Sequence, residues 1–220
     1  MTGHRTPIVL AAIGGASGVG KTSVLNAALP TLEAKALVMN TGTYFKNALQ
    51  IESRDDVRVS DWPDVEARVA RAIADDIRGS DSSLLIVDTH FAAKTRFGTY
   101  RVGLDETLIT AVAQAAADTA EIRGVALLLR VALIYSEVAQ LLDRRRHDTT
   151  RARELDAYDC YNALRHNRRC GPHYSSAFRR VDNAHTRFVL LENKVLADAA
   201  RGLASTLTPS EVRTDDTTPT

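Results

Sequence analysis

The sequence predicts an α/β fold in which helices flank a single parallel β-sheet of five strands. Strand-like and helix-like segments alternate along the chain, which is typical of a parallel sheet with crossover helices. The strand-like segments are short and mostly apolar, as expected for strands that helices cover on both faces. A glycine-rich loop follows the first of them, at the end of a strand where such sheets bind ligands.

Five apolar runs are the predicted strands. They cover residues 8–13, 36–39, 84–88, 125–133 and 188–191. Helical spacing of apolar side chains predicts helices between and after these strands. The helices cover residues 21–32, 43–51, 63–77, 104–116, 138–142, 158–169 and 195–207. Pro63 suits the first turn of its helix, and residues 89–103 are predicted to form a loop.

Residues 15–22, Gly-Ala-Ser-Gly-Val-Gly-Lys-Thr, match the phosphate-binding pattern G-x-x-x-x-G-K-[ST]. Glycines allow backbone N–H groups to turn inward, and these groups form an anion site with the helix N-terminus. We expect Lys21 to reach the β- and γ-phosphates of ATP and the Thr22 hydroxyl to bind Mg²⁺. The predicted nucleotide ligands are Gly15, Ser17, Gly18, Val19, Gly20, Lys21, Thr22 and Ser23.

Asp88 ends the third predicted strand, where a carboxylate can bind Mg²⁺ or accept a proton from the attacking oxygen. The alternative is a structural aspartate that caps a turn. His90, Lys94 and Tyr100 follow in the predicted loop and are candidate ligands of an anionic acceptor. Each of these three, taken alone, also fits an ordinary loop or surface residue.

Residues 144–153 contain five arginines, and such a cluster repels itself unless anions neutralise it. An arginine-rich lid stabilises a phosphoryl group in transfer and excludes water from the site. A solvent-exposed helix end is the alternative. Nucleic-acid binding is disfavoured, because residues 144–157 contain no aromatic side chain for stacking. The segment interrupts the alternation of strands and helices, and therefore predicts an insert at the active-site edge of the sheet.

Length and composition suit one domain over residues 1–208, with a polar tail at 209–220 that we expect to be disordered. The net charge of +1 gives no general attraction to nucleic acid or membrane. No apolar stretch approaches the roughly 20 residues of a membrane span. The few residues before the first predicted strand leave no room for a signal peptide, so we expect a cytoplasmic protein.

Five collinear stretches of the chain resemble the archaeal-type adenylate kinases, which are P-loop nucleoside monophosphate kinases. They are the phosphate loop, Asn-Thr-Gly-Thr-Tyr-Phe at 40–45, Arg-Asp-Asp-Val-Arg at 54–58, Val-Asp-Thr-His within 87–104, and Arg-Arg with Thr-Arg-x-Arg within 144–174. The resemblance implies a P-loop kinase fold, with acceptor-side helices over about 40–80 and a lid region at 144–175.

The same resemblance implies roles for individual residues. Arg144, Arg151 and Arg153 would act in catalysis with Lys21 and Asp88. The substrate ligands would be Asn40, Gly42, Thr43, His90, Lys94, Tyr100 and Arg168. The chain departs from the family where Thr43 replaces a usual acid, and where residues 169–172 interrupt a usually smooth helix.

These observations predict an ATP- and Mg²⁺-dependent phosphotransferase, best described as a nucleoside monophosphate kinase. Two alternatives stay open, namely a kinase of a nucleoside or another small hydroxyl compound, and a nucleotide-binding regulatory protein with weak ATPase activity. The expected partner is a small-molecule phosphoryl acceptor. The sequence does not decide whether the protein forms a homo-oligomer.

Overall fold

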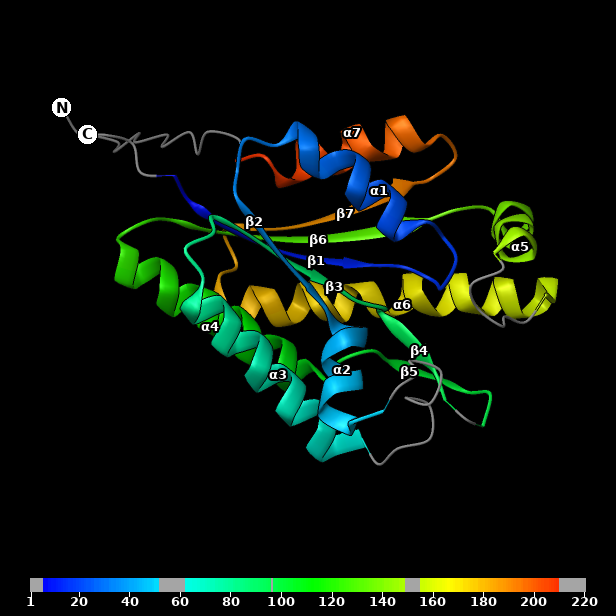
Figure 1. Cartoon of the computed structure of the whole chain (residues 1–220), viewed down its shortest axis with the longest axis horizontal. Coiled ribbons are helices and arrows are strands. Elements are labelled where there is room, and N and C mark those ends of the chain that lie inside the picture. The colour runs from blue at the N-terminus through cyan, green and yellow to red at the C-terminus, as the bar shows by residue number, and fades with distance from the viewer. Residues whose placement is uncertain (1–5, 52–61, 96, 149–154, 210–220) are drawn as a thin grey trace, which may run out of the picture.

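The computed structural model describes residues 6–51, 62–95, 97–148 and 155–209. Five strands form its main sheet in the order β2-β3-β1-β6-β7 (Figure 1). Their bounds are Ile8–Gly14 for β1, Ala36–Asn40 for β2, Leu84–Asp88 for β3, Leu127–Tyr135 for β6 and Thr186–Glu192 for β7. All neighbouring strands of this sheet are parallel, so the predicted five-stranded parallel sheet is confirmed.

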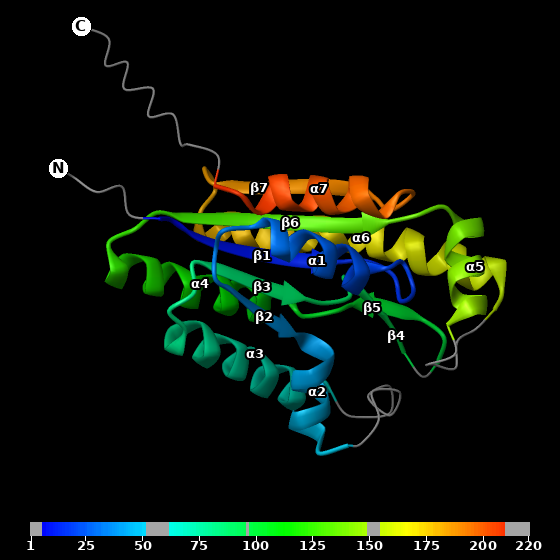
Figure 2. The ribbon, with the colours of Figure 1, turned by 45° about the horizontal axis from the view of Figure 1, so that its top comes forward.

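Helices cover both faces of the sheet (Figure 2). Helices α1 (Lys21–Ala28) and α7 (Leu196–Leu207) lie on one face, and α3 (Trp62–Gly79), α4 (Glu106–Arg123) and α6 (Ala157–Val181) lie on the other. Alternate side chains of the fully buried strand β1 enter two separate apolar cores, with Val9 in the α1–α7 core and Leu10 in the α3–α4–α6 core. The continuous apolar runs in the sequence therefore reflect burial on both faces.

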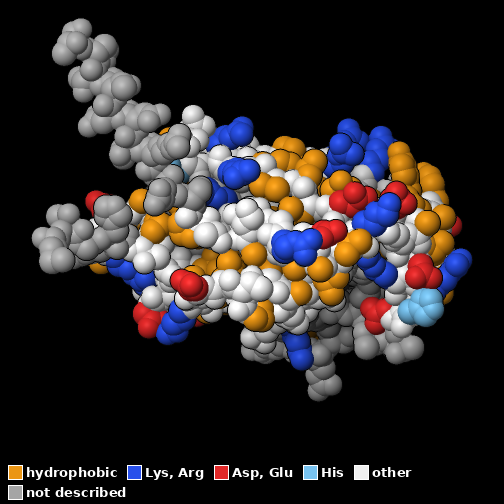
Figure 3. Space-filling view, turned by 90° about the horizontal axis from the view of Figure 1, so that it is seen from above, with side chains coloured by type: hydrophobic (Ala, Val, Ile, Leu, Met, Phe, Trp, Pro, Cys, Tyr) orange, Lys and Arg blue, Asp and Glu red, His pale blue; other side chains and the backbone are white. Residues whose placement is uncertain are grey.

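Shorter elements complete the described part of the chain. Helix α1 continues into a single 3₁₀ turn, η1 (Leu29–Thr31), while α2 (Thr41–Leu49) follows β2 directly and α5 (Val138–His147) follows β6. The face formed by α1 and α7 carries charged side chains of both signs among apolar ones (Figure 3). None of the described helices is both long enough and apolar enough to cross a membrane.

The prediction of a plain loop over residues 89–103 is wrong. Strands β4 (Ala92–Lys94) and β5 (Tyr100–Val102) pair there as an antiparallel hairpin. Thr95 N donates to Thr99 O at 2.8 Å to close the turn. Strands of three residues are too short to show a period in the sequence, and contacts with α6 hold the hairpin in place.

Helix α6 runs on past residue 169, where the sequence predicted its end, and continues through Pro172 to Val181. Tertiary packing explains the difference. A Cβ atom added at Gly171 would lie 3.1 Å from the Phe188 ring and 3.3 Å from Phe91, so the glycine allows close packing of α6 on the sheet. The free energy gained by burying the Tyr174 and Phe178 side chains offsets the cost of the backbone hydrogen bond that Pro172 cannot make.

Both cysteines lie on α6 as buried free thiols. Cys160 and Cys170 are separated by about 15 Å along the helix axis, since each residue adds about 1.5 Å. A disulfide between them would need Cα atoms within about 7 Å of each other. The geometry therefore excludes an internal disulfide.

Candidate active site

The carboxyl ends of β1, β2 and β3 bring the main candidate residues to one edge of the sheet. In the strand register, Asp88 pairs with Ile13 of β1 on one side and with Asn40 of β2 on the other. The phosphate loop, residues 15–22, leaves β1 at this same edge. Open α/β sheets bind ligands at such an edge.

Two glycines of the phosphate loop hold positions that a side chain would obstruct. A Cβ atom on Gly15 would lie 2.4 Å from the Ile134 carbonyl oxygen. Gly20 has a φ of +90°, and its Cβ atom would lie 2.5 Å from Nδ2 of Asn193. Gly20 also precedes α1 without offering a side-chain cap, so the N–H groups of the first helical turn suit an anion.

Side chains from distant segments bind the carbonyl groups of the phosphate loop. Val19 O accepts from Arg144 Nη1 and from Asn193 Nδ2, both at 2.9 Å, and Arg144 Nη2 donates to Asn193 O at 2.6 Å. Arg145 Nε donates to Ser17 O at 3.2 Å. These contacts hold the loop by its carbonyl groups, and one N–H group, that of Val19, donates within the loop to Ala16 O at 3.2 Å.

Lys21 and His90, which are 69 residues apart in the chain, meet beside the phosphate loop. Lys21 Nζ lies 3.2 Å from His90 Nδ1 and 3.4 Å from Gly15 O, and His90 Nδ1 lies 2.7 Å from Gly15 O. His90 Nδ1 cannot donate to Gly15 and accept from Lys21 at once, so the ring tautomer decides which bond forms. Thr22 and Ser23 are exposed at the start of α1.

Hydrogen bonds from the β2–α2 corner fix the orientation of Asp88, whose side chain is buried. Asn40 Nδ2 donates to Asp88 Oδ2 at 2.6 Å, and Asn40 Oδ1 accepts from Thr43 N at 3.3 Å as the cap of α2. Thr41 Oγ1 donates to the Asp88 carbonyl oxygen at 3.2 Å. Gly42 lies in the same first turn, so the predicted residues 40, 42 and 43 adjoin Asp88.

A second group of polar side chains gathers around Asp159 near the start of α6. Its carboxylate accepts from Lys94 Nζ at 2.8 Å, from Arg145 Nη1 at 2.9 Å and from the Tyr100 hydroxyl at 3.3 Å. Burial, together with the charge of Asp159, raises the pKa of Tyr100 to about 12. The Tyr100 ring stacks on His166 with centroids 4.6 Å apart. Lys94 and Tyr100, predicted as acceptor ligands, are thus tied to α6.

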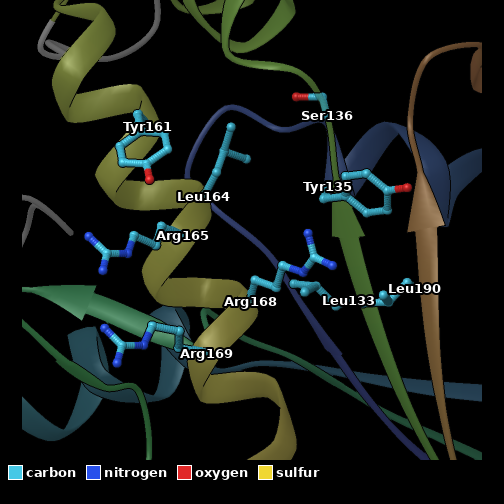
Figure 4. Close-up of a pocket in the computed structure, with 9 residues that line it drawn as sticks. All are labelled: Leu133, Tyr135, Ser136, Tyr161, Leu164, Arg165, Arg168, Arg169 and Leu190. Carbon is cyan, nitrogen blue, oxygen red and sulfur yellow. The ribbon is translucent and has the colours of Figure 1, made fainter.

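Other predicted residues do not join this arrangement. Arg168 lines a separate cavity between α6 and strands β6 and β7 (Figure 4). Arg151 and Arg153 lie outside the described residues, as does the stretch 54–58. Of the four arginines to which the resemblance assigns a role, only Arg144 lies against the phosphate loop in the described part of the chain, where it binds backbone carbonyl groups.

Sequence analysis did not identify three residues of the site, namely Arg145, Asp159 and Asn193. Arg145 looks no different there from its arginine neighbours, and Asp159 is one of four acids among the arginines of residues 144–180. Asn193 had a usable signal, because it follows the last predicted strand and thus lies at the same edge of the sheet as Asp88.

No family model matches the chain. It is similar to the adenylate kinase of Methanoculleus marisnigri, with 27% identity over 201 residues that cover 88% of this chain and 95% of that protein. It is also similar to the adenylate kinase of Sulfurisphaera tokodaii, with 28% identity over 149 residues that cover 63% of this chain and 69% of that protein. The resemblance to archaeal adenylate kinases is confirmed.

Solved structures with a similar fold include shikimate kinase from Bacteroides thetaiotaomicron, with a TM-score of 0.51 and 9% identity over 90% of this chain and 97% of that chain. Shikimate kinase from Acinetobacter baumannii has a TM-score of 0.50 and 13% identity, over 91% of this chain and 90% of that chain. At such low identity the likeness concerns the fold alone. It confirms the predicted α/β fold of the P-loop kinase type.

Proposed function

We propose that this chain transfers the γ-phosphoryl group of ATP to a nucleoside monophosphate. The observation that carries the proposal is the meeting of the phosphate loop, Lys21, His90 and Asp88 at one edge of the sheet. The similarity to two adenylate kinases, one of them over nearly its whole length, supports a nucleoside monophosphate as the acceptor.

The phosphate loop and Lys21 would bind the donor. The N–H groups of the loop and of the first turn of α1 suit the phosphate oxygens, and the Lys21 ammonium group adds a charge that follows the γ-phosphoryl group. Lys21 Nζ lies 3.4 Å from Gly15 O and 3.2 Å from His90 Nδ1, and these contacts hold the ammonium group beside the phosphate loop.

The residues also fit Mg²⁺, which proteins usually hold through one or two carboxylates and the substrate's phosphates. Thr22 and Asp88 are the proposed holders, and the Asn40 amide keeps the Asp88 carboxylate in one orientation. When bound, Mg²⁺ supplies charge neutralisation on the β- and γ-phosphate oxygens. The described residues include no cluster of three or more His, Cys, Asp or Glu side chains that could hold a metal ion unaided.

The acceptor would bind between the start of α2 and the β4–β5 hairpin. Asn40, Gly42 and Thr43 lie on the first side, and Lys94 and Tyr100 lie on the second. Lys94 pairs with Asp159 at 2.8 Å, so an acceptor phosphate would compete with that carboxylate for the ammonium group.

Three further expectations from the sequence remain predictions. They are the lid role of residues 144–175, the single domain over residues 1–208 and the cytoplasmic location.

An acceptor screen tests the proposal. ADP release from ATP and Mg²⁺ is measured with AMP, the other nucleoside monophosphates, nucleosides and shikimate as acceptors. We expect a nucleoside monophosphate to give the highest kcat/KM. A nucleoside or another hydroxyl compound as the best acceptor would refute the proposed acceptor class. ATP hydrolysis without transfer to any acceptor would favour a regulatory protein.

Lys21→Ala tests the donor site in the same assay. Loss of a contact that strengthens in the transition state typically lowers kcat by about 10²–10³. Lys35→Ala is the matched control, since Lys35, which directly precedes β2, pairs with Asp81 in an exposed ion pair. We expect the control to keep full activity. Unchanged turnover in Lys21→Ala would exclude the phosphate loop as the donor site.

A further inference from the structure

A cavity of about 460 Å³ lies between the first half of α6 and the ends of β6 and β7 (Figure 4). Its lining residues come from these three elements and from the residue that follows β6. They are Leu133, Tyr135, Ser136, Tyr161, Leu164, Arg165, Arg168, Arg169 and Leu190. Apart from Arg168, no residue predicted or placed in the candidate active site lines this cavity. Its volume is in the range of small-molecule sites, about 300–1,000 Å³.

Much of the lining is apolar and suits a flat ring. Leu133, Leu164 and Leu190 contribute aliphatic surface, and Tyr135 and Tyr161 contribute aromatic rings. Leu190 is 44% exposed and Tyr161 is 49% exposed. Apolar side chains are therefore accessible at the opening, and a ligand that covered them would remove apolar surface from water.

Ser136 provides a polar group in this lining. Its side chain is buried, and its Oγ atom makes no hydrogen bond with any described residue. A buried hydroxyl without a hydrogen-bond partner is destabilising, and such groups in native proteins are usually satisfied. A ligand in the cavity would supply the missing partner.

Arg168 provides a positive charge. Its guanidinium group lies in the space between α6 and β6 and points toward the Tyr135 ring, whereas Arg165 and Arg169 point away from β6 (Figure 4). Arg168 makes no ion pair with any described residue, and no acidic side chain is among the lining residues. Guanidinium groups bind carboxylates and phosphates through two parallel hydrogen bonds.

We propose that this cavity binds a small organic anion with a flat apolar ring that carries a carboxylate or a phosphate. Arg168 pairs with the anionic group, the Ser136 hydroxyl makes a hydrogen bond to the ligand, and the leucine and tyrosine side chains cover the ring. No residue that we propose to bind ATP or Mg²⁺ lines this cavity, so the inference does not rest on the proposed kinase function.

Calorimetric titration of the full chain tests the proposal with 2-naphthoate, 2-naphthyl phosphate and the neutral 2-naphthamide, in saturating ADP and Mg²⁺. We expect one molecule of an anionic probe to bind per chain, at least about ten-fold more tightly than the neutral amide, as a charge-assisted hydrogen bond predicts. The tighter of the two anions shows whether a carboxylate or a phosphate is preferred.

Three variants locate the binding. Arg168→Gln should lower the affinity for the anion about ten-fold and abolish the preference over the amide, while Ser136→Ala should lower it several-fold. Arg179→Gln, which removes an exposed arginine farther along α6, should bind like the parent. Equal affinity for anion and amide in the parent, or identical binding by Arg168→Gln and Arg179→Gln, would overturn the proposal.

Discussion

Asp159→Asn should destabilise the fold, because Asp159 joins three elements through one carboxylate. It binds Lys94 of β4 and Arg145 of α5, and it lies near the start of α6. Only 5% of the Arg145 side chain and 14% of the Asp159 side chain are exposed. Asparagine keeps the shape and the hydrogen-bonding oxygen but removes the negative charge, so Arg145 loses a counter-ion in a place that water hardly reaches.

Removal of one partner from a fully buried ion pair costs about 3–5 kcal/mol. The partial exposure of Asp159 and the remaining amide oxygen reduce this figure, so we expect a loss of about 2–3 kcal/mol in the free energy of unfolding. In a domain of about 200 residues, each kcal/mol shifts Tm by about 2–4 °C. The expected decrease in Tm is therefore about 4–12 °C.

Thermal and urea unfolding of Asp159→Asn, the parent and Asp75→Asn measures this difference. Asp75 pairs with Arg78 at 3.1 Å, but both side chains are more than half exposed, so Asp75→Asn should change stability by no more than about 0.5 kcal/mol. If Asp159→Asn unfolded at the same temperature and urea concentration as Asp75→Asn, burial would not make the Asp159–Arg145 ion pair stronger than an exposed pair.

Three further perturbations follow from the structure. Asp88→Asn should keep its contact with Asn40 and its melting temperature but lower kcat at least about ten-fold in steady-state kinetics, and unchanged kcat would reduce Asp88 to a structural residue. Gly20→Ala should lose about 2 kcal/mol or more in urea unfolding because of its φ of +90° and its contact with Asn193, whereas Gly79→Ala, with open space around it, should be neutral or stabilising. Burial, together with the charges of Arg165 and Arg169, lowers the pKa of His166 in the folded protein. The unfolded chain therefore binds a proton at this histidine more readily than the folded chain, and stability should fall as the pH drops below about 6.5. His166→Gln should show a smaller fall in Tm between about pH 7.5 and about pH 5.5, and an equal fall would exclude this role.

The main sheet was predictable because its signal is local and strong. Residues 84–88 and 8–13 are buried on both faces, and that burial leaves an unbroken apolar run in the sequence. The β4–β5 hairpin was not predictable in this way. Its Ala92 N donates at 3.1 Å to Oδ1 of Asn167, which is 75 residues away, so part of its support comes from α6 rather than from its own sequence.

The same distinction applies to the candidate site. The phosphate loop could be recognised because its glycines and Lys21 are consecutive and their conformations depend on immediate neighbours. The contact of Lys21 with His90 spans 69 residues, and the contact of Arg144 with Val19 spans 125, so only the folded chain reveals them. In the sequence nothing distinguishes Arg144, which binds the loop, from Arg168, which lines a different cavity.

The strand order gives the chain a modular character. Residues 36–88 supply both strands on one side of β1, and residues 127–192 supply both strands on the other side. The chain therefore passes from one side of the central strand to the other between β3 and β6, through the hairpin and α4. The segment from the start of β2 to the end of β5 is continuous in sequence, so two junctions join it to the rest of the chain. Replacement of this segment would therefore change Asp88, His90 and the residues of the proposed acceptor site together, and would leave the phosphate loop on its own strand.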